Sequence, residues 1–99
     1  MPISRELVIG RHTEAALESI LDLSDLDAFN MGVSRRHALI RRTESGFEVI
    51  DLVSKNGTWL NAEQLVPNKP YPFASGSQLR IGAMRLIIVY HVVGKGVYI

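Results

Sequence analysis

The sequence predicts an all-β domain, either a sandwich or a barrel, and three observations lead to this prediction. Its 99 residues are the right number for one compact domain. Valine and isoleucine together number 18 against seven alanines, and β-branched side chains favour strands. Short apolar segments also alternate with turns rich in glycine, asparagine and proline, which is typical of small all-β domains.

The hydrophobic pattern places individual strands along the chain. Two hairpins are predicted, one over 38–50 and one that turns at Gly82 and Ala83. In the second strand of the first hairpin, alternation puts Phe47, Val49 and Asp51 on one face. The run 86–90 is apolar on both faces, so it predicts a central or doubly covered strand. The expected strands are 6–10, 19–23, 37–42, 46–52, 58–60, 78–82 and 85–92.

Two segments permit more than one interpretation. Residues 13–26 have the spacing of an amphipathic helix with Thr13 as its N-cap, but 20–24 also fits a strand. We favour the strand, with a helical turn open over 14–18. Residues 93–99 are expected to be a frayed end or the start of a linker. The chain 1–99 is thus expected to be a single, monomeric domain with its core over about 6–92, standing alone or within a larger chain.

Composition excludes several classes of function. There are no cysteines, so disulfides, thiolate metal sites and cysteine nucleophiles are absent. Eleven basic against ten acidic side chains give a formal charge of +1, which argues against a general nucleic-acid binder. No apolar run is long enough for a signal peptide or a membrane span. We expect no metal, no cofactor and no membrane partner, and a cytoplasmic location, or a nuclear one in a eukaryote.

Three short clusters supply the chemistry of an anion pocket. They lie at 10–11, 34–37 and 54–58, each just outside an expected strand. An arginine offers a planar fork of donors for phosphate, and a serine hydroxyl donates one more hydrogen bond. Backbone N–H groups at tight turns can add a small anion nest. Taken one at a time, these residues are ordinary turn and strand-end residues, so the prediction depends on their combination.

In this order and spacing, the clusters resemble the forkhead-associated (FHA) domain family. The matching blocks are Leu-Val-Ile-Gly-Arg at 7–11, Gly-Val-Ser-Arg-Arg-His-Ala at 32–38 and Asp-Leu-Val-Ser-Lys-Asn-Gly-Thr-Trp-Leu-Asn at 51–61. A fourth, Leu-Arg-Ile-Gly, lies at 79–82, and the resemblance covers about 6–92. It implies an antiparallel β-sandwich of about eleven strands, whose loops at one end bind phosphothreonine in an extended partner segment.

The resemblance also implies a role for each site residue. Arg11 would grip the phosphate, and Ser34 would donate its hydroxyl to the same group. Arg35 would contribute its backbone N–H and could add its side-chain charge. Lys55 stands where the family often has a hydroxyl residue, and it would offer a charge instead. Asn56 would hold the ligand backbone beside the phosphoresidue.

Four further residues are expected to support the site. His37 would orient the Ser34 loop, and Thr58 would anchor the strand that follows the third block. Gly10 and Gly57 would supply backbone freedom.

The expected function is therefore phosphothreonine-dependent recruitment of a protein partner, either a Ser/Thr kinase or a substrate that it has phosphorylated. A phosphate-independent FHA-type adaptor is the alternative. Catalysis is not expected, because Ser34 and His37 have no third, orienting acid and the sequence contains no nucleophile elbow or Walker loop.

Overall fold

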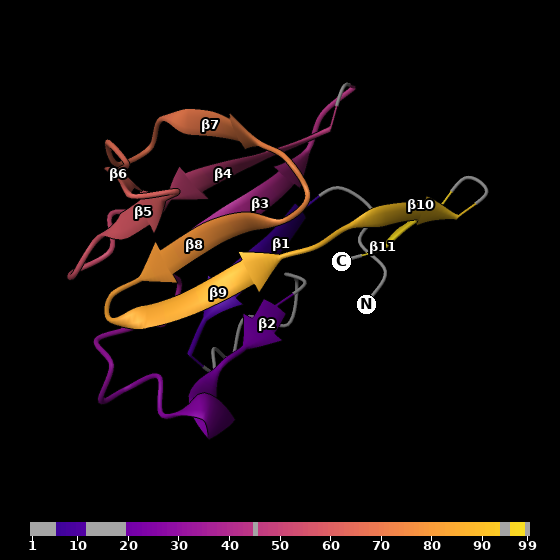
Figure 1. Ribbon diagram of the computed structural model, residues 1–99. Helices are drawn as coiled ribbons and strands as arrows, with labels where there is room; N and C mark the ends of the chain where they lie inside the picture. Colours follow the sequence, from indigo (N-terminus) through magenta and orange to yellow (C-terminus); the bar gives the residue numbers. More distant parts are fainter. Residues whose placement is uncertain (1–5, 12–19, 45, 94–95, 99) are drawn as a thin grey trace.

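The computed structural model of the protein describes residues 6–11, 20–44, 46–93 and 96–98, and within them the fold is all-β. Two sheets face each other, one with the strand order β2-β1-β3-β4-β7 and one with the order β6-β5-β8-β9 (Figure 1). A separate pair, β10 and β11, extends from one end. The strands are β1 (Glu6–Gly10), β2 (Ile20–Asp22), β3 (Ala38–Arg42), β4 (Phe47–Asp51), β5 (Thr58–Leu60), β6 (Glu63–Gln64), β7 (Pro70–Phe73), β8 (Ser77–Ile81), β9 (Met84–Ile88), β10 (His91–Val93) and β11 (Gly96–Tyr98).

The core lies between the two large sheets. Alternate side chains of β3 and β8 point inward, which gives these two strands their alternating burial, whereas the last three residues of β4 are all buried. The largest fully buried aliphatic side chains come from both sheets: Leu7, Ile9, Ile40, Val49, Leu79 and Ile81. The sandwich prediction is thus confirmed, and the packed core gives the loops at its end a rigid base.

Both predicted hairpins are confirmed. Arg42 pairs with Phe47 at the first turn, and Ile81 pairs with Met84 at the second. The strand predicted within 13–26 is also present as β2, followed by a short 3-10 turn, Ser24–Leu26. The helical turn considered for 14–18 lies outside the described residues.

The sheets differ from the prediction in two respects. Strand β2 pairs with β1 in parallel, so the sandwich is not purely antiparallel. Nine of the described strands form the two large sheets, fewer than the approximately eleven expected, and β10 and β11 form the separate pair. Residues 93 and 96–98, expected in an irregular tail, therefore belong to this hairpin.

The prediction of a central strand over 86–90 is wrong. Within the described residues β9 pairs only with β8, so it is an edge strand and ends at Ile88. Ile87 is 70% exposed and Val89 is 58% exposed. The doubly apolar sequence therefore covers the core with one face and leaves an apolar strip on the surface with the other.

Strand β7 was not predicted, because two prolines so close together, Pro70 and Pro72, are typical of a loop. Proline is compatible with an edge strand, where a backbone N–H can be missing without breaking a ladder, and β7 lies at the edge of its sheet. Among the described residues, no helix is long and apolar enough to cross a membrane.

Candidate functional site

Four connections meet at one end of the sandwich and are tied together by hydrogen bonds. They follow β1, precede β3, join β4 to β5, and turn from β8 into β9. Arg11 N–H donates to the Ser34 carbonyl at 3.2 Å, and Ala83 N–H donates to the Met31 carbonyl at 2.8 Å. Because these bonds run between loops that are distant in sequence, the loops form one braced surface.

Arg11 is held over this surface by two contacts. Its Nε donates to the Val33 carbonyl at 2.6 Å, and its guanidinium carbon lies 5.0 Å from the centre of the Phe29 ring. Phe29 is 73% exposed, so the stack lies at the surface. Within the described residues, the two terminal nitrogens of Arg11 have no hydrogen-bond partner. The guanidinium is therefore oriented and still has donors for an anion.

Gly10 permits the close approach of the Ser34 loop. A Cβ at this position would lie 2.1 Å from the Arg35 carbonyl oxygen and 2.8 Å from that of Ser34. Its φ angle is not among the positive ones, so the backbone freedom expected for Gly10 is not what the fold uses. The close approach of the Ser34 loop requires instead that residue 10 has no side chain. Gly57 does have a positive φ, of 87°, as a turn residue that favours glycine.

Ser34 links the second and third loops. Its Oγ accepts a hydrogen bond from Lys55 N–H at 3.1 Å, and its own N–H donates to His37 Nδ1 at 3.0 Å. The hydroxyl proton is therefore not used by the Lys55 bond and can be donated to an anion. Because the contact with His37 is made by the backbone rather than by the hydroxyl, these residues do not form a nucleophile–base pair.

His37 is completely buried and bridges the same two loops. Its Nδ1 accepts from Ser34 N–H, so the ring proton sits on Nε2, which donates to the Gly57 carbonyl at 2.8 Å. Burial lowers the pKa of His37, and this effect outweighs the Gly57 hydrogen bond and the charge of Asp51, which both raise it. A neutral ring with one donor and one acceptor nitrogen fits both of its partners.

Asn56 reaches across to the second loop. Its Nδ2 donates to the Gly32 carbonyl at 2.8 Å, which leaves a second N–H and the Oδ1 acceptor on an exposed amide. Arg35 and Lys55 are also exposed. The neighbouring loops thus carry three cationic residues, one hydroxyl and one partly used amide, a set of groups suited to a polyanionic ester on an extended chain.

Comparison with known proteins shows the family. The family model described as the FHA domain matches residues 7–82. The chain belongs to the FHA family. Among the described residues of this FHA domain, no group of histidine, aspartate and glutamate side chains is arranged to hold a metal ion.

Two curated relatives illustrate the similarity. The chain is 39% identical over 80 residues to the oxoglutarate dehydrogenase inhibitor of Corynebacterium diphtheriae, an alignment that covers 81% of this chain and 48% of that protein. It is 35% identical over 98 residues to the glycogen accumulation regulator GarA of Mycobacterium tuberculosis, which covers 89% and 59% respectively. This FHA domain thus spans about half the length of these relatives.

Solved structures agree with the fold. One comes from work on phosphothreonine-dependent FHA domain interactions and matches with a TM-score of 0.69 at 30% identity, covering 92% of this chain and 82% of that one. Another is the FhaA FHA domain in complex with the intracellular domain of Rv3910, with a TM-score of 0.62 at 29% identity. It covers 86% of this chain and 80% of that one.

A buried carboxylate supports the third loop of this FHA domain and was missed at the sequence level. Asp51 is 2% exposed and accepts hydrogen bonds from Ser54 Oγ, Ser54 N–H and Thr58 Oγ1. Ser54 Oγ in turn accepts from Gly57 N–H at 3.1 Å. A signal was available, because alternation places Asp51 on the core-facing side beside Phe47 and Val49. A core-facing aspartate requires donors nearby.

The neutral state of His37 predicts a pH dependence of stability. In the unfolded chain histidine titrates at about pH 6.5, whereas the folded FHA domain holds this ring neutral to a lower pH. The stability that His37 contributes should therefore be complete above about pH 6.5 and decline as the pH falls below it. Urea unfolding at intervals from pH 7.5 to 5.0 measures the decline. His37→Gln, which cannot titrate, should show a shallower one, and equal declines would contradict this role.

Proposed function

We propose that this FHA domain binds a protein segment containing phosphothreonine and does so without catalysing a reaction. The observation that carries the proposal is the convergence of Arg11, Ser34 and Asn56 on one braced surface. A phosphorylated side chain carries a charge of about −1.5 to −2 and three strong acceptor oxygens. A domain with a net charge of +1 can hold such a group only where donors are concentrated.

Each donor has a distinct task in this proposal. The terminal nitrogens of Arg11 grip two phosphate oxygens, because a guanidinium matches them in a planar fork. The Ser34 hydroxyl and the Arg35 backbone N–H complete the contact with the same phosphate. Lys55 adds a mobile charge at the rim. Lys55 N–H is already bonded to Ser34, so its contribution comes from the side chain.

Asn56 then fixes the ligand backbone. One N–H of its amide holds the Gly32 carbonyl, while the other N–H and Oδ1 remain for a peptide N–H and C=O next to the phosphothreonine. Of the supporting residues, His37 and Gly57 hold the two loops together, Thr58 anchors Asp51, and Gly10 lets the Ser34 loop approach. The site is thereby formed before the ligand arrives, which reduces the entropy lost on binding.

The partner in this proposal is a protein phosphorylated by a Ser/Thr kinase, or the kinase itself. Two similar proteins are named as an enzyme inhibitor and as a regulator of glycogen accumulation. This similarity supports a signalling role for the domain. The absence of cysteine suits a reducing compartment, so we propose the cytoplasm as the location, or the nucleus in a eukaryote.

A degenerate peptide library tests this function. The same peptides are synthesised with phosphothreonine, phosphoserine or unmodified threonine at the fixed position, and binding is measured by calorimetry on the best of them. We expect the phosphothreonine peptide to bind tightest and the unmodified one not to bind. Equal binding of modified and unmodified peptides would overturn the proposal and support a phosphate-independent adaptor.

Asn56→Ala should weaken binding of the selected phosphopeptide by about tenfold, because it removes hydrogen bonds to the ligand backbone and the tie to Gly32. Calorimetry gives the loss of affinity. The melting temperature should change little, since Asn56 is exposed. An affinity equal to that of the parent would remove Asn56 from the site.

A further inference from the structure

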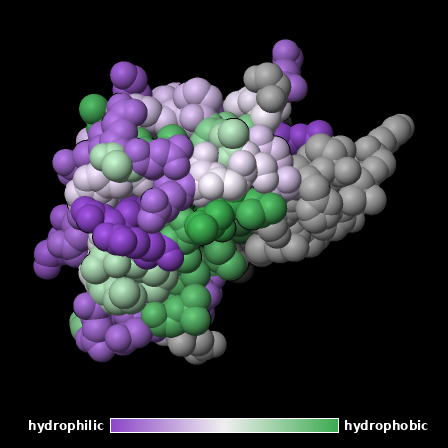
Figure 2. All heavy atoms as spheres, in the orientation of Figure 1, coloured by the Kyte–Doolittle hydropathy of each residue, from purple (hydrophilic) through white to green (hydrophobic). Residues whose placement is uncertain are grey.

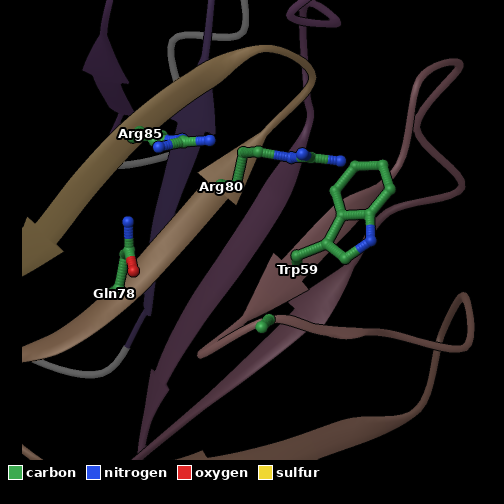
Figure 3. A pocket seen from close by; sticks show the side chains of 5 residues that line it. Trp59, Gln78, Arg80 and Arg85 are labelled. Carbon is green, nitrogen blue, oxygen red and sulfur yellow. The ribbon is translucent and has the colours of Figure 1, made fainter.

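A row of side chains crosses the outer face of the four-stranded sheet. The strand register places Gln64 opposite Trp59, Trp59 opposite Arg80, and Arg80 opposite Arg85. The guanidinium carbon of Arg80 lies 3.7 Å from the centre of the Trp59 ring, and Arg85 projects from β9 on the same side (Figure 3). Two cationic side chains and one indole thus share a surface that has no part in the phosphate contacts proposed above.

These side chains line a hollow of about 310 Å³, together with Ala62 and Gln78. The Gln78 amide stands on the same face, beside the two arginines (Figure 3). Figure 2 shows a hydrophilic surface over the first part of β9 and a hydrophobic surface over its later part, where Ile87 is exposed. The hollow therefore combines cationic and amide groups with apolar surroundings.

The charges on this face of the sheet are unbalanced. Like charges directly opposite each other in a ladder destabilise a sheet, and Arg80 and Arg85 are such a pair. Within the described part of the chain, no carboxylate pairs with either of them. In addition, Arg80 Nε is buried without a hydrogen-bond partner. A buried donor without an acceptor is unfavourable. An anionic acceptor in the hollow would also reduce the repulsion between the two arginines.

We propose that this hollow binds the carboxylates of an acidic stretch in the partner polypeptide. A carboxylate matches a guanidinium in a bidentate pair, and the Gln78 amide can donate a further bond. The Trp59 ring offers the stem of a glutamate an apolar surface. A metal cation does not fit a site whose charged groups are both cations.

A second groove indicates that the acidic stretch belongs to the same polypeptide as the phosphothreonine. This groove contains Gly32 and Asn56, and it shares Trp59 and Arg80 with the first hollow. A chain held at Asn56 can therefore continue along the groove to Arg80 and Arg85. This step rests on the proposed function, whereas the affinity of the hollow for carboxylates does not.

The first experiment uses a peptide without phosphate. Trp59 is the only tryptophan in the chain, so its fluorescence reports on the hollow directly. Titration with hexaglutamate should change the emission in a saturable manner, and Arg85→Gln should weaken this response by about three- to tenfold. Arg42→Gln is the matched control, since Arg42 is an exposed arginine on the other sheet. The proposal would be overturned if hexaglutamate left the Trp59 emission unchanged, or if both substitutions weakened the binding of hexaglutamate equally.

The second experiment separates this proposal from the proposed function. Phosphothreonine peptides are compared with an acidic or a Gly/Ser stretch on either side of the phosphoresidue. We expect the acidic form to bind the parent about three- to tenfold tighter and to lose this advantage in Arg85→Gln. If neither phosphopeptide binds but hexaglutamate still perturbs Trp59, the phosphothreonine function fails and the carboxylate site stands. If both phosphopeptides bind equally well, the function stands and the proposal that the hollow binds an acidic stretch of the partner is overturned.

Discussion

Arg11→Ala is expected to weaken binding of a phosphothreonine peptide by about 100-fold or more. The substitution removes a guanidinium that the Val33 carbonyl orients at the Ser34 loop, and hydrogen bonds between charged groups are the strongest contacts available to a phosphate. The fold should survive, because Arg11 is only half-buried, its N–H bond to the Ser34 carbonyl is kept by alanine, and its side chain contacts the described residues through one hydrogen bond and one ring contact at the surface. Calorimetry with the selected phosphopeptide measures the loss.

Arg42→Ala provides the control for this measurement. Arg42 is an exposed arginine at the end of β3 that lies away from the site, so it removes the same charge without touching the pocket. Its affinity should match that of the parent within about twofold. If Arg11→Ala also binds at the parent level, the pocket has been assigned to the wrong residues.

Asp51→Ala is expected to cause the largest loss of stability, roughly 3 kcal/mol, or a melting temperature roughly 12–24 °C lower. Asp51 is the common acceptor for Ser54 and Thr58, and Thr58 is itself fully buried. Truncation leaves these donors without partners and opens a void beneath the Lys55–Asn56 loop. Thermal and urea unfolding measure the change.

Asp51→Asn tests the reason given for this loss. It keeps an acceptor at Oδ1, where the Ser54 and Thr58 hydroxyls donate, and it keeps the volume of the side chain. It should therefore destabilise less than alanine does. An Asp51→Ala protein that melts within a few degrees of the parent would contradict the network described here.

The fold was most predictable where the local pattern alone specifies which strands pair. The hairpin of β3 and β4 follows from alternation on both sides of a short turn, and no distant contact is needed to specify it. Strand β9 illustrates the opposite case. Its composition is that of a central strand, but whether a strand has one neighbour or two depends on chain order in the sheet, which the local pattern does not contain.

The candidate site was predictable as a set of residues but not as a network. Motif order identified Arg11, Ser34 and Asn56, and the structure brings their loops together. The bond between His37 and the Ser34 loop is in keeping with the role expected for His37. The bond of His37 to Gly57 and the Asp51 network were not apparent, because they depend on which side chains are buried. The Trp59–Arg80 stack depends on cross-strand register, which was inaccessible for the same reason.

The most direct test of the central claim is to follow backbone amide shifts by NMR while the phosphothreonine peptide is titrated into the protein. The account predicts that the largest changes in chemical shift occur at Arg11, Ser34, Arg35, Lys55 and Asn56. The unphosphorylated peptide should leave the chemical shifts of these amides unchanged. Binding that leaves all five unmoved while another face of the sandwich responds would contradict it.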